Sequence, residues 1–451
     1  MRDIEKGSTR REFLAAGAAL GAVALARHGR AEVIEKAASR PSDQSSPSRR
    51  VVVGIMGISQ KSGGGMARGT DLAHALLAIP GVDIAYVCDV DQRNVSHAIE
   101  TVSKKLEKGS APPKGVKDFR RILDDRSVDA LAIAAPDHWH APAAILACAA
   151  GKHVYVEKPC SHNAREGELL VEAAQKYRRL VQHGTQRRSW PAIREAVERL
   201  RAGDIGRVIS ASSYYWSARP TIGRGRQTDV PGWLDWNLWQ GPAPRRAFHD
   251  NIVHYKWHCF WHWGTGECGN NGVHMIDLAR WGLGIDYPNV VSCTGGKYRF
   301  SEDDQQTPDT SVVTFNFGDK LMTWENRSWA ARTPMEADYD VLFAGEKGFL
   351  AIRGSGYAIL DHKGKPLARG SGDGGDVSHM RNFIDAIRDG APLNAPIDQG
   401  ARSALLCHLG NISFRTSRTV HLDPQTHRIS NDSEAAAMWG RQYEAGWEPR
   451  A

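Results

Sequence analysis

Short apolar runs alternate with helical patterns between residues 50 and 188, and this alternation constrains the fold more than any other feature of the chain. The run Val51–Gly57 is rich in valine and isoleucine and ends in glycine, as expected for a buried parallel strand. Similar runs lie at 84–89, 131–135, 154–156 and 180–181, with helical stretches at 141–150 and 165–178. Strands that alternate with helices predict a doubly wound α/β domain built on a parallel sheet.

The residues that follow the first two strands fit a dinucleotide. Gly57 occupies the first position of a Gly-x-Gly-x-x-Gly phosphate loop, Ser59 replaces the second glycine, and about five extra residues precede Gly65. Asp89 closes the second strand, where its carboxylate can accept hydrogen bonds from both hydroxyls of an adenosine ribose. The same carboxylate would repel a 2′-phosphate, so the sequence favours NAD over NADP.

After residue 188 the pattern changes to strands in series. We expect strands at 208–216, 290–300, 310–317, 320–327, 339–344 and 349–352, followed by a helical stretch over 379–415. Val313, Phe315 and Phe317 alternate with polar residues, which is typical of a sheet with one buried face. The sequence therefore predicts a dinucleotide-binding Rossmann domain over 50–188. The sequence also predicts an α+β domain over 189–451 with a large and mostly antiparallel sheet.

Residues 1–31 resemble a twin-arginine export signal. Arg10 and Arg11 precede Phe13, a weakly apolar segment follows, and Ala24–Ala26 provides a small-residue cleavage pattern. Residues 32–49 are rich in Ser, Pro and Arg and are typical of a linker. We therefore expect export through the twin-arginine pathway to the periplasm or another extracytoplasmic space, with no membrane anchor in the mature protein.

Composition argues against several classes of protein. The chain has 451 residues, of which 41% are hydrophobic and 24% charged, and these are ordinary values for globular domains. Its net charge is +7, but residues 1–50 hold ten Lys/Arg and six Asp/Glu, and no basic stripe follows them, so no nucleic-acid partner is expected. The longest uncharged apolar stretch, Phe13–Ala26, is shorter than the roughly 18 residues of a membrane span. The seven cysteines have no Cys-x-x-Cys spacing.

Two motifs at the ends of later strands carry a family resemblance. Ala135–His140 has the sequence Ala-Pro-Asp-His-Trp-His, and Gly151–Pro159 ends in Glu-Lys-Pro. With His183–Gln186 and Gly264–Asp277, these motifs resemble the Gfo/Idh/MocA oxidoreductases, named for glucose–fructose oxidoreductase and inositol dehydrogenase. The resemblance covers nearly the whole chain after residue 50. It implies an NAD-dependent enzyme that acts on a small carbohydrate and forms a homo-oligomer, with the domain over 189–451 serving substrate binding and oligomerisation.

The resemblance also implies catalytic roles for three residues. Lys158 matches the lysine that reaches the reacting carbon, where an ammonium group stabilises the developing alkoxide or moves a proton. His274 matches the family's catalytic histidine, and an imidazole suits the removal of a hydroxyl proton. Asn270 stands where the family commonly has aspartate; it cannot titrate in a proton relay but can hydrogen-bond a sugar hydroxyl. Asp277, one helical turn after His274, is expected to brace the helix.

The remaining site residues come from these motifs and from an aromatic segment. Cofactor contacts are assigned to Arg93, Pro136, His138, His140, Glu157 and Gln186. Eight of the 14 tryptophans lie between Trp216 and Trp281, and tryptophans interleaved with histidines are typical of a carbohydrate pocket, for which we select His258 and Trp261. His254, His258 and His262 share a four-residue spacing that zinc can use, but no His-Glu-x-x-His pattern accompanies it, so no metal is expected.

Three functions are compatible with these residues. The first is an NAD(H)-dependent oxidoreductase that acts on CH–OH groups of a sugar or sugar derivative with a tightly bound cofactor. The second is a redox-elimination glycosidase of the same fold, in which NAD oxidises a ring carbon, the aglycone is eliminated and the cofactor returns to its starting state. The third is a sugar-binding protein with a vestigial nucleotide site, supported by the altered glycine loop and Asn270. An exported enzyme meets no soluble nicotinamide pool, so export favours hydrolysis or a coupled two-sugar redox cycle.

Overall fold

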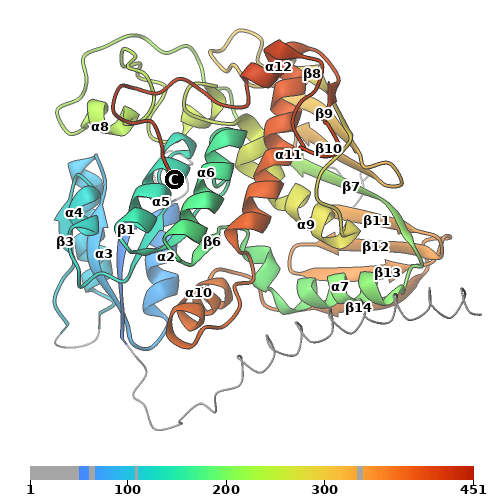
Figure 1. The fold of residues 1–451 in the computed structure, drawn as a ribbon, viewed down its shortest axis with the longest axis horizontal. Helices are drawn as coiled ribbons and strands as arrows, with labels where there is room; N and C mark the ends of the chain where they lie inside the picture. The colour runs from blue at the N-terminus through green and yellow to red at the C-terminus, as the bar shows by residue number, and fades with distance from the viewer. Residues whose placement is uncertain (1–49, 60–66, 107–109, 333–338) are drawn as a thin grey trace, which may run out of the picture. The chain divides into compact units, whose positions relative to one another are not determined.

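A computed structural model describes residues 50–59, 67–106, 110–332 and 339–451. Residues Arg50–Ala451 form one compact unit, which contains two β-sheets (Figure 1). The predicted export signal, the linker and Gly65 lie outside the described residues. Among the described helices, none combines the length and apolarity that a bilayer crossing requires.

The first sheet has six strands in the order β3-β2-β1-β4-β5-β6, and all of its pairings are parallel. Its strands are β1 (Val51–Met56), β2 (Val82–Cys88), β3 (Lys114–Val116), β4 (Ala130–Ile133), β5 (His153–Val156) and β6 (Val181–His183). The connecting helices are α2 (Arg68–Leu77), α3 (Gln92–Ser103), α4 (Arg120–Leu123), α5 (Asp137–Ala149) and α6 (Ala164–Lys176). This strand order is that of a Rossmann fold and confirms the predicted doubly wound class.

The second sheet has nine strands among the described residues, in the order β14-β13-β12-β11-β7-β10-β9-β8-β15. They are β7 (Val208–Trp216), β8 (Val290–Gly296), β9 (Thr310–Asn316), β10 (Leu321–Arg327), β11 (Val341–Gly345), β12 (Gly348–Arg353), β13 (Gly356–Leu360), β14 (Pro366–Ser371) and β15 (Val420–His421). Within the described part of the chain, β7 and β10 pair in parallel and the other neighbours are antiparallel. The mostly antiparallel α+β prediction is therefore confirmed.

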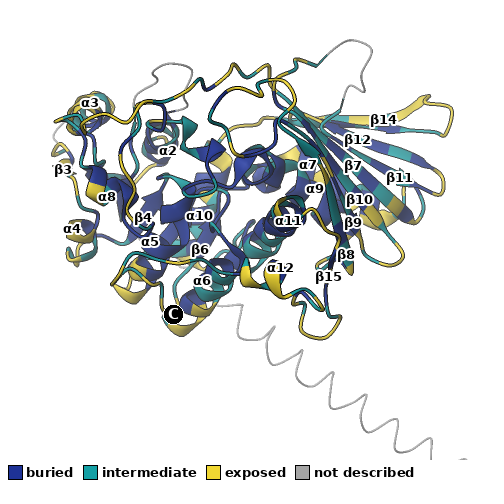
Figure 2. Ribbon diagram, turned by 90° about the horizontal axis from the view of Figure 1, so that it is seen from above, coloured by how far each residue is buried: buried dark blue, intermediate teal, exposed yellow. Residues whose placement is uncertain are grey.

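One face of the second sheet is covered by α7 (Pro191–Ala202), α9 (Val273–Leu283) and α11 (Ile397–Thr416), as Figure 2 shows. The core between them includes Val313, Phe315 and Trp324, each at most 1% exposed. The burial of Val313 and Phe315 follows the alternation seen in the sequence, because a strand turns every second side chain to the same face. Short helices α8 (Trp236–Gln240) and α12 (Ser433–Ala437) lie outside this layer.

Two boundaries differ from the sequence-based expectation. The strand predicted over 290–300 ends at Gly296, because the backbone amides of Tyr298, Arg299 and Phe300 donate to the Asp309 carboxylate instead of to a neighbouring strand. The helical stretch expected over 379–415 is two helices, α10 (Val377–Asp389) and α11. Gly390 ends the first of them in the left-handed region, where glycine meets no steric penalty.

Strands β13 and β14 have no counterpart in the prediction. Residues Pro366–Ser371 lie at the sheet edge and are exposed or half-buried, so they carry no apolar alternation that could have revealed them.

Helix α10 links the C-terminal region to the first sheet. Its side chains Met380, Phe383 and Ile384 are fully buried in the core that also contains Val53 and Ile55 of β1. The core of the Rossmann sheet therefore includes side chains from beyond the predicted boundary at residue 188, because residues after 370 cover one face of that sheet.

Candidate active site

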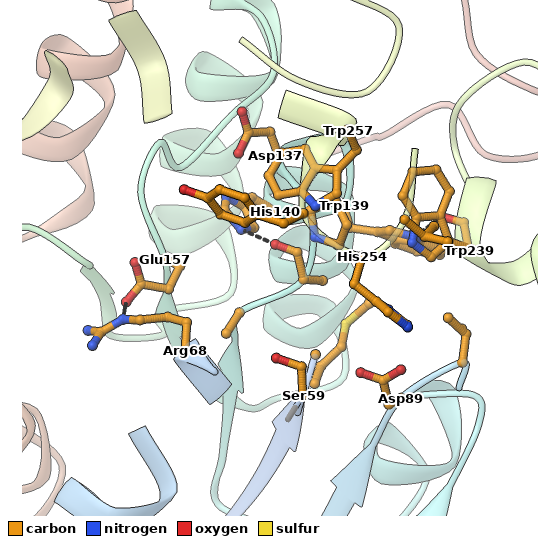
Figure 3. Close-up of a pocket in the computed structure, with 18 of the residues that line it drawn as sticks. Ser59, Arg68, Asp89, Asp137, Trp139, His140, Glu157, Trp239, His254 and Trp257 are labelled. Atoms are coloured by element: carbon orange, nitrogen blue, oxygen red, sulfur yellow. Dashed lines mark hydrogen bonds and ion pairs between the residues drawn. The ribbon is translucent and has the colours of Figure 1, made fainter. Parts of the chain in front are cut away.

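A cavity of about 550 Å³ opens at the carboxyl ends of the first sheet. Residues that follow β1, β2, β4 and β5 line one side of it, and residues from 250–257 and 270–274 line the other. The sheet order reverses between β1 and β4, and ligands of doubly wound proteins bind in the crevice at this point. Figure 3 shows Ser59 and Asp89 among the residues that line this cavity, and Arg68 in contact with Glu157.

Two glycines shape the cofactor side of the cavity. Gly57 has φ +86°, and a Cβ there would lie 2.5 Å from the backbone of Ala134 and Ala135. Gly69 opens α2, and a Cβ there would lie 2.3 Å from the carbonyl oxygen of Gly57. Gly69 therefore supplies the close helix–strand approach that the third glycine of a dinucleotide motif provides. Gly65, the candidate phosphate-loop glycine in the sequence, lies outside the described residues. Gly69 is marked in the sequence only by its place at the beginning of the helix.

Asp89 lies just after β2 and lines the cavity, as the ribose-binding assignment requires. One carboxylate oxygen accepts hydrogen bonds from the Asp91 amide at 2.8 Å and the Asn94 side chain at 3.4 Å. Burial raises the pKa of Asp89 to about 7, although these hydrogen bonds oppose the rise. A carboxylate in this position fits the two hydroxyl groups of a nucleotide ribose, and the glycine cradle fits the adjacent pyrophosphate.

Glu157, at the end of β5, belongs to an ionic chain that was not visible in the sequence. Its carboxylate lies 2.6 Å from Arg68 Nε, and the same guanidinium contacts Asp376, from the turn before α10, at 2.6 Å. Burial opposes ionisation of Glu157, but the charges of Arg68 and Lys158 outweigh it and lower the pKa of Glu157 to about 2. Three distant segments thereby meet at one wall of the cavity.

The three predicted catalytic residues line the same cavity. Lys158 Nζ donates to the backbone oxygen of Asn270 and lies 3.4 Å from its side-chain oxygen. Asn270 belongs to the π-helical turn Cys268–Gly272, which runs directly into α9, where His274 lies. A π-helical turn widens the helix locally and is frequent at functional sites.

His274 carries a neutral imidazole. Burial, with the nearby charge of Lys158, holds the pKa of His274 well below its usual range. Its Nδ1 is buried and has no hydrogen-bond partner within the described residues. A neutral imidazole on the lining of a cavity is suited to accepting a proton from a substrate hydroxyl.

Asp277 braces α9, as expected from the sequence. Both oxygens of its carboxylate accept hydrogen bonds from Arg188, at 2.7 and 2.9 Å, and one also accepts from Ser403 at 2.6 Å. All three side chains are buried, so this pair ties the end of the Rossmann domain to α9 and α11.

Tyr255 also lines the cavity and was not identified from the sequence. Its hydroxyl oxygen accepts hydrogen bonds from Arg219 at 2.9 Å and from the Asn270 amide at 3.4 Å. Burial would raise its pKa, but the positive charges of His258 and Arg219 outweigh burial and lower the pKa of Tyr255 below its usual value. Only the fold brings Arg219 to Tyr255, so no local sequence signal marks this phenol.

Four residues that were assigned to the site from the sequence do not line this cavity, and their positions correct those assignments. His138 turns its ring nitrogens to the carbonyl oxygens of Trp239 and Trp263, at 2.9 and 3.3 Å. The guanidinium of Arg93 bonds to Asp91 and lies 3.6 Å from the ring centre of Trp233.

The two predicted substrate residues are corrected in the same way. His258 is 3% exposed and lies behind Tyr255, with Nδ1 2.6 Å from the Tyr255 carbonyl oxygen and Nε2 3.5 Å from Glu267. Trp261 lines a separate cavity. The aromatic side chains that do line the first cavity include Trp139, Trp239, Tyr255 and Trp257 (Figure 3 labels the three tryptophans).

The other assigned residues Gly57, Ser59, Pro136, His140, Glu157 and Gln186 all line the cavity. The evenly spaced histidines do not converge, because the segment forms only a short 3₁₀ turn at Lys256–Cys259. His254 contacts Asp91 at 3.1 Å, and His262 lies 2.8 Å from the Pro244 carbonyl oxygen. Within the described ranges, no group of three His, Cys, Asp or Glu side chains could hold a metal ion.

Fold and cavity together define an NAD-binding oxidoreductase class, and comparison with known proteins identifies the family. Residues 49–185 match the model of the oxidoreductase family's NAD-binding Rossmann fold, and residues 206–319 match the family's C-terminal alpha/beta domain. Since these two models of one family cover more than half of the sequence, the chain belongs to the Gfo/Idh/MocA oxidoreductase family. The match confirms the predicted NAD-binding domain.

Individual relatives differ in their named activities. A levoglucosan dehydrogenase from Pseudarthrobacter phenanthrenivorans is 30% identical over 37% of this chain, an alignment that spans only 36% of that enzyme. A glycosyl hydrolase family 109 protein from Parabacteroides distasonis is 26% identical over 69% of this chain and 67% of its own length. The structure of an aldose–aldose oxidoreductase from Caulobacter crescentus has a TM-score of 0.63 at 17% identity, covering 83% of this chain and 100% of that one, and supports the fold.

Proposed function

We propose that this protein is an oxidoreductase that interconverts a hydroxyl and a carbonyl group on a sugar or sugar derivative, with NAD held tightly in the cavity. The observation that carries the proposal is the convergence of Lys158, Asn270 and His274 on the cavity that also contains Gly57 and Asp89. Proton-handling and charge-stabilising side chains thus lie in the same space as the nucleotide-binding residues.

NAD, when bound, accepts a hydride from the substrate carbon or returns one to it. Lys158 is held by the Asn270 carbonyl oxygen and stabilises negative charge that develops on the substrate oxygen. His274 is neutral and takes the hydroxyl proton. Tyr255, with its lowered pKa and its bond to Asn270, is a second group that can donate or accept a proton in this cavity.

The aromatic wall supports a carbohydrate as the substrate. Trp139, Trp239 and Trp257 present apolar rings to the cavity, and the amide of Asn270 and the hydroxyl of Tyr255 supply hydrogen-bonding groups opposite the cofactor residues. Flat apolar surfaces combined with a few polar groups suit the faces and hydroxyls of a sugar ring. The similarity to a levoglucosan dehydrogenase also supports a carbohydrate substrate.

A redox-elimination glycosidase is the second candidate. The match to a family 109 glycosyl hydrolase covers 69% of this chain and thus extends beyond the Rossmann domain. Export, proposed from Arg10 and Arg11, also favours a reaction that restores its own cofactor, because no soluble nicotinamide pool exists outside the cytoplasm. In that reaction the same residues would remove and return protons while a glycosidic bond breaks.

Identification of the bound nucleotide tests the proposal first. Protein purified without added cofactor should release NAD or NADH on denaturation, and release of NADP would contradict the Asp89 argument. Absence of any nucleotide, together with failure to bind added NAD, would favour the sugar-binding protein with a vestigial nucleotide site.

Measurement of the products of turnover then distinguishes the two candidate functions. Accumulation of NADH in proportion to sugar consumed, with no glycosidic bond cut, supports net oxidoreduction. A glycosidase should cleave an aryl glycoside with no net change in NADH, and it should exchange deuterium with solvent at the carbon beside the oxidised one. Inositols, aldoses and aryl glycosides are suitable first probes.

Association of identical chains is also part of the proposal. The face of the nine-stranded sheet opposite the covering helices carries Val312 and Leu321, which are 42% and 45% exposed. Apolar side chains on an open sheet face suit contact between copies of a protein. Sedimentation of the purified protein should give a mass above that of one chain; a monomer at all concentrations would contradict this part.

A further inference from the structure

A second cavity, of about 440 Å³, shares no lining residue with the first. It lies between the beginning of α6, residues 244–246, residues 261–265, the last turns of α11 and residues 437–442. Thr265 separates the two cavities, since its backbone amide and hydroxyl donate to Asp137, which lines the first cavity, at 3.1 and 2.6 Å. Nothing in the reaction proposed above uses this space.

The lining of the second cavity is strongly cationic. Four arginines contribute to it, and no aspartate or glutamate among the described residues does. The arginines are Arg245, Arg246, Arg415 and Arg441. The buried carboxylate of Glu166 lies outside the lining and accepts hydrogen bonds from the Tyr443 hydroxyl and the His162 amide, at 2.9 and 2.8 Å.

Among the described residues, only Arg245 of these four arginines has a carboxylate partner, Glu444 at 4.0 Å. Within the same ranges, the guanidinium groups of Arg441 and Arg415 form no such pair. Arg441 bonds through Nε to the Gln442 carbonyl oxygen at 3.3 Å, while its Nη1 is buried without a partner. Arg415, the more exposed of the two, lies 5.2 Å from the ring centre of Trp261 and forms no ion pair within the described ranges. Burial lowers the pKa of both arginines, and for Arg441 it outweighs the opposing charge of the buried Glu166 carboxylate.

His162 also lines the second cavity and has hydrogen-bonding groups without partners among the described residues. Both of its ring nitrogens are buried and have no partner among the described residues. Burial, with the charge of Arg441, keeps the pKa of His162 well below its usual range, so the ring is neutral and offers one N–H donor. Buried polar atoms are nearly always paired in folded proteins, so several unpaired donors around one cavity indicate a missing ligand.

We infer that the second cavity is a binding site for a small molecule that carries a carboxylate or phosphate group. Guanidinium groups bind such oxyanions with two parallel hydrogen bonds, and Arg415 of α11 and Arg441 after α12 supply charge from two separate segments of the lining. The N–H of His162 donates to a further oxygen. The ring of Trp261, which the sequence analysis assigned to the substrate, covers the apolar part of this second ligand.

Calorimetric titration of the full-length protein, saturated with NAD and in phosphate-free buffer, tests the inference. Inorganic phosphate and acetate are titrated separately, so that a phosphate site and a carboxylate site can be told apart. We expect one of the two anions, or both, to bind with one site per chain. If neither binds, or if excess NAD abolishes a binding that is seen without it, the inference is wrong.

Arginine variants locate the site. Arg441→Gln should weaken anion binding by roughly tenfold or more, and Arg415→Gln should weaken it less, because that side chain is more exposed. Arg207→Gln is the matched control: it removes the same charge from an arginine paired with Glu346 at 3.1 Å, outside the cavity, and should bind as the wild type does.

Circular dichroism shows whether each variant is folded. If Arg441→Gln is unstable, Arg441→Lys takes its place. The lysine variant keeps the charge but cannot form the bidentate contact, so its anion affinity should also fall. Wild-type affinity in both the Arg415 variant and either Arg441 variant would overturn the assignment.

Discussion

Asp89 shows how the surroundings of one side chain change what the residue does. In the sequence it is a strand-end carboxylate that selects NAD, and in the structure burial brings its pKa to about 7. A ribose that donates two hydrogen bonds stabilises the ionised carboxylate, so cofactor binding and deprotonation of Asp89 are linked.

The affinity for NAD should therefore rise with pH and level off above about pH 7. Below that pH, Asp89 is protonated in the free protein, and binding must first remove the proton, which costs up to about tenfold in affinity for each pH unit. Equilibrium titrations of cofactor-free protein between about pH 5.5 and 8.5 measure the effect. Asp89→Asn should bind weakly and without this pH dependence; a flat wild-type profile would contradict the linkage.

In the proposed function, Lys158 acts on the substrate and not on the nucleotide. Lys158→Ala should lower kcat by roughly 10²–10⁴-fold while NAD stays bound, because the side chain contacts Asn270 and stabilises charge only as the reaction proceeds. Single-turnover rates and the NAD content of the purified variant give the two quantities. Lys152→Ala is a control outside the first cavity, and loss of NAD from the Lys158 variant would contradict the assigned role.

At the scale of elements, the site depends on how closely α2 approaches β1. A glycine at position 69 lets the helix begin against the Gly57 carbonyl oxygen, so the strand end, the turn and the helix N-terminus enclose one cavity. The π-helical turn before α9 has a comparable role on the opposite wall, since it places Asn270 beside Lys158.

Gly69→Ala should separate α2 from β1. Its Cβ would lie 2.3 Å from the Gly57 oxygen, and overpacking of this kind costs about 1–3 kcal/mol of unfolding free energy. We expect a lower melting temperature and weaker NAD binding, measured by calorimetry. Gly232→Ala adds the same methyl group where no atom lies within 4 Å and should change neither quantity. Equal stability of the two variants would show that the helix can shift without cost.

At the scale of the whole molecule, the parts of Arg50–Ala451 are joined by buried and half-buried ion pairs. Arg68 connects the Rossmann sheet to Asp376 before α10, and Arg188 connects the end of that sheet to Asp277 in α9. The two cavities share this framework, with Asp137 and Thr265 between them. Both cavities belong to the compact unit Arg50–Ala451.

Replacement of Arg10 and Arg11 by lysine should leave the precursor in the cytoplasm with its activity intact, because the signal precedes the unit that contains both cavities. Fractionation of cells that express the variant and the wild type, followed by activity measurement in each fraction, checks this expectation. Unchanged export of the variant would refute the twin-arginine proposal.

The sequence by itself determined the class of fold and the end of the sheet where the chemistry lies. Strand and helix periodicities are local, and the carboxyl ends of parallel strands must meet at one edge, so the order of the chain alone places Gly57, Asp89 and Lys158 together. Edge strands such as β14 were missed because an exposed strand has no apolar alternation.

Only the tertiary structure decided which way the other side chains point. His138 and His140 are two residues apart on α5, yet His140 lines the cavity, while the ring nitrogens of His138 lie 2.9 and 3.3 Å from the carbonyl oxygens of Trp239 and Trp263. Arg219 reaches Tyr255, and Arg441 lines a second cavity with Trp261, through contacts between distant segments. Such contacts depend on how the layers pack and on which charges are buried together. Local sequence patterns contain no information about either.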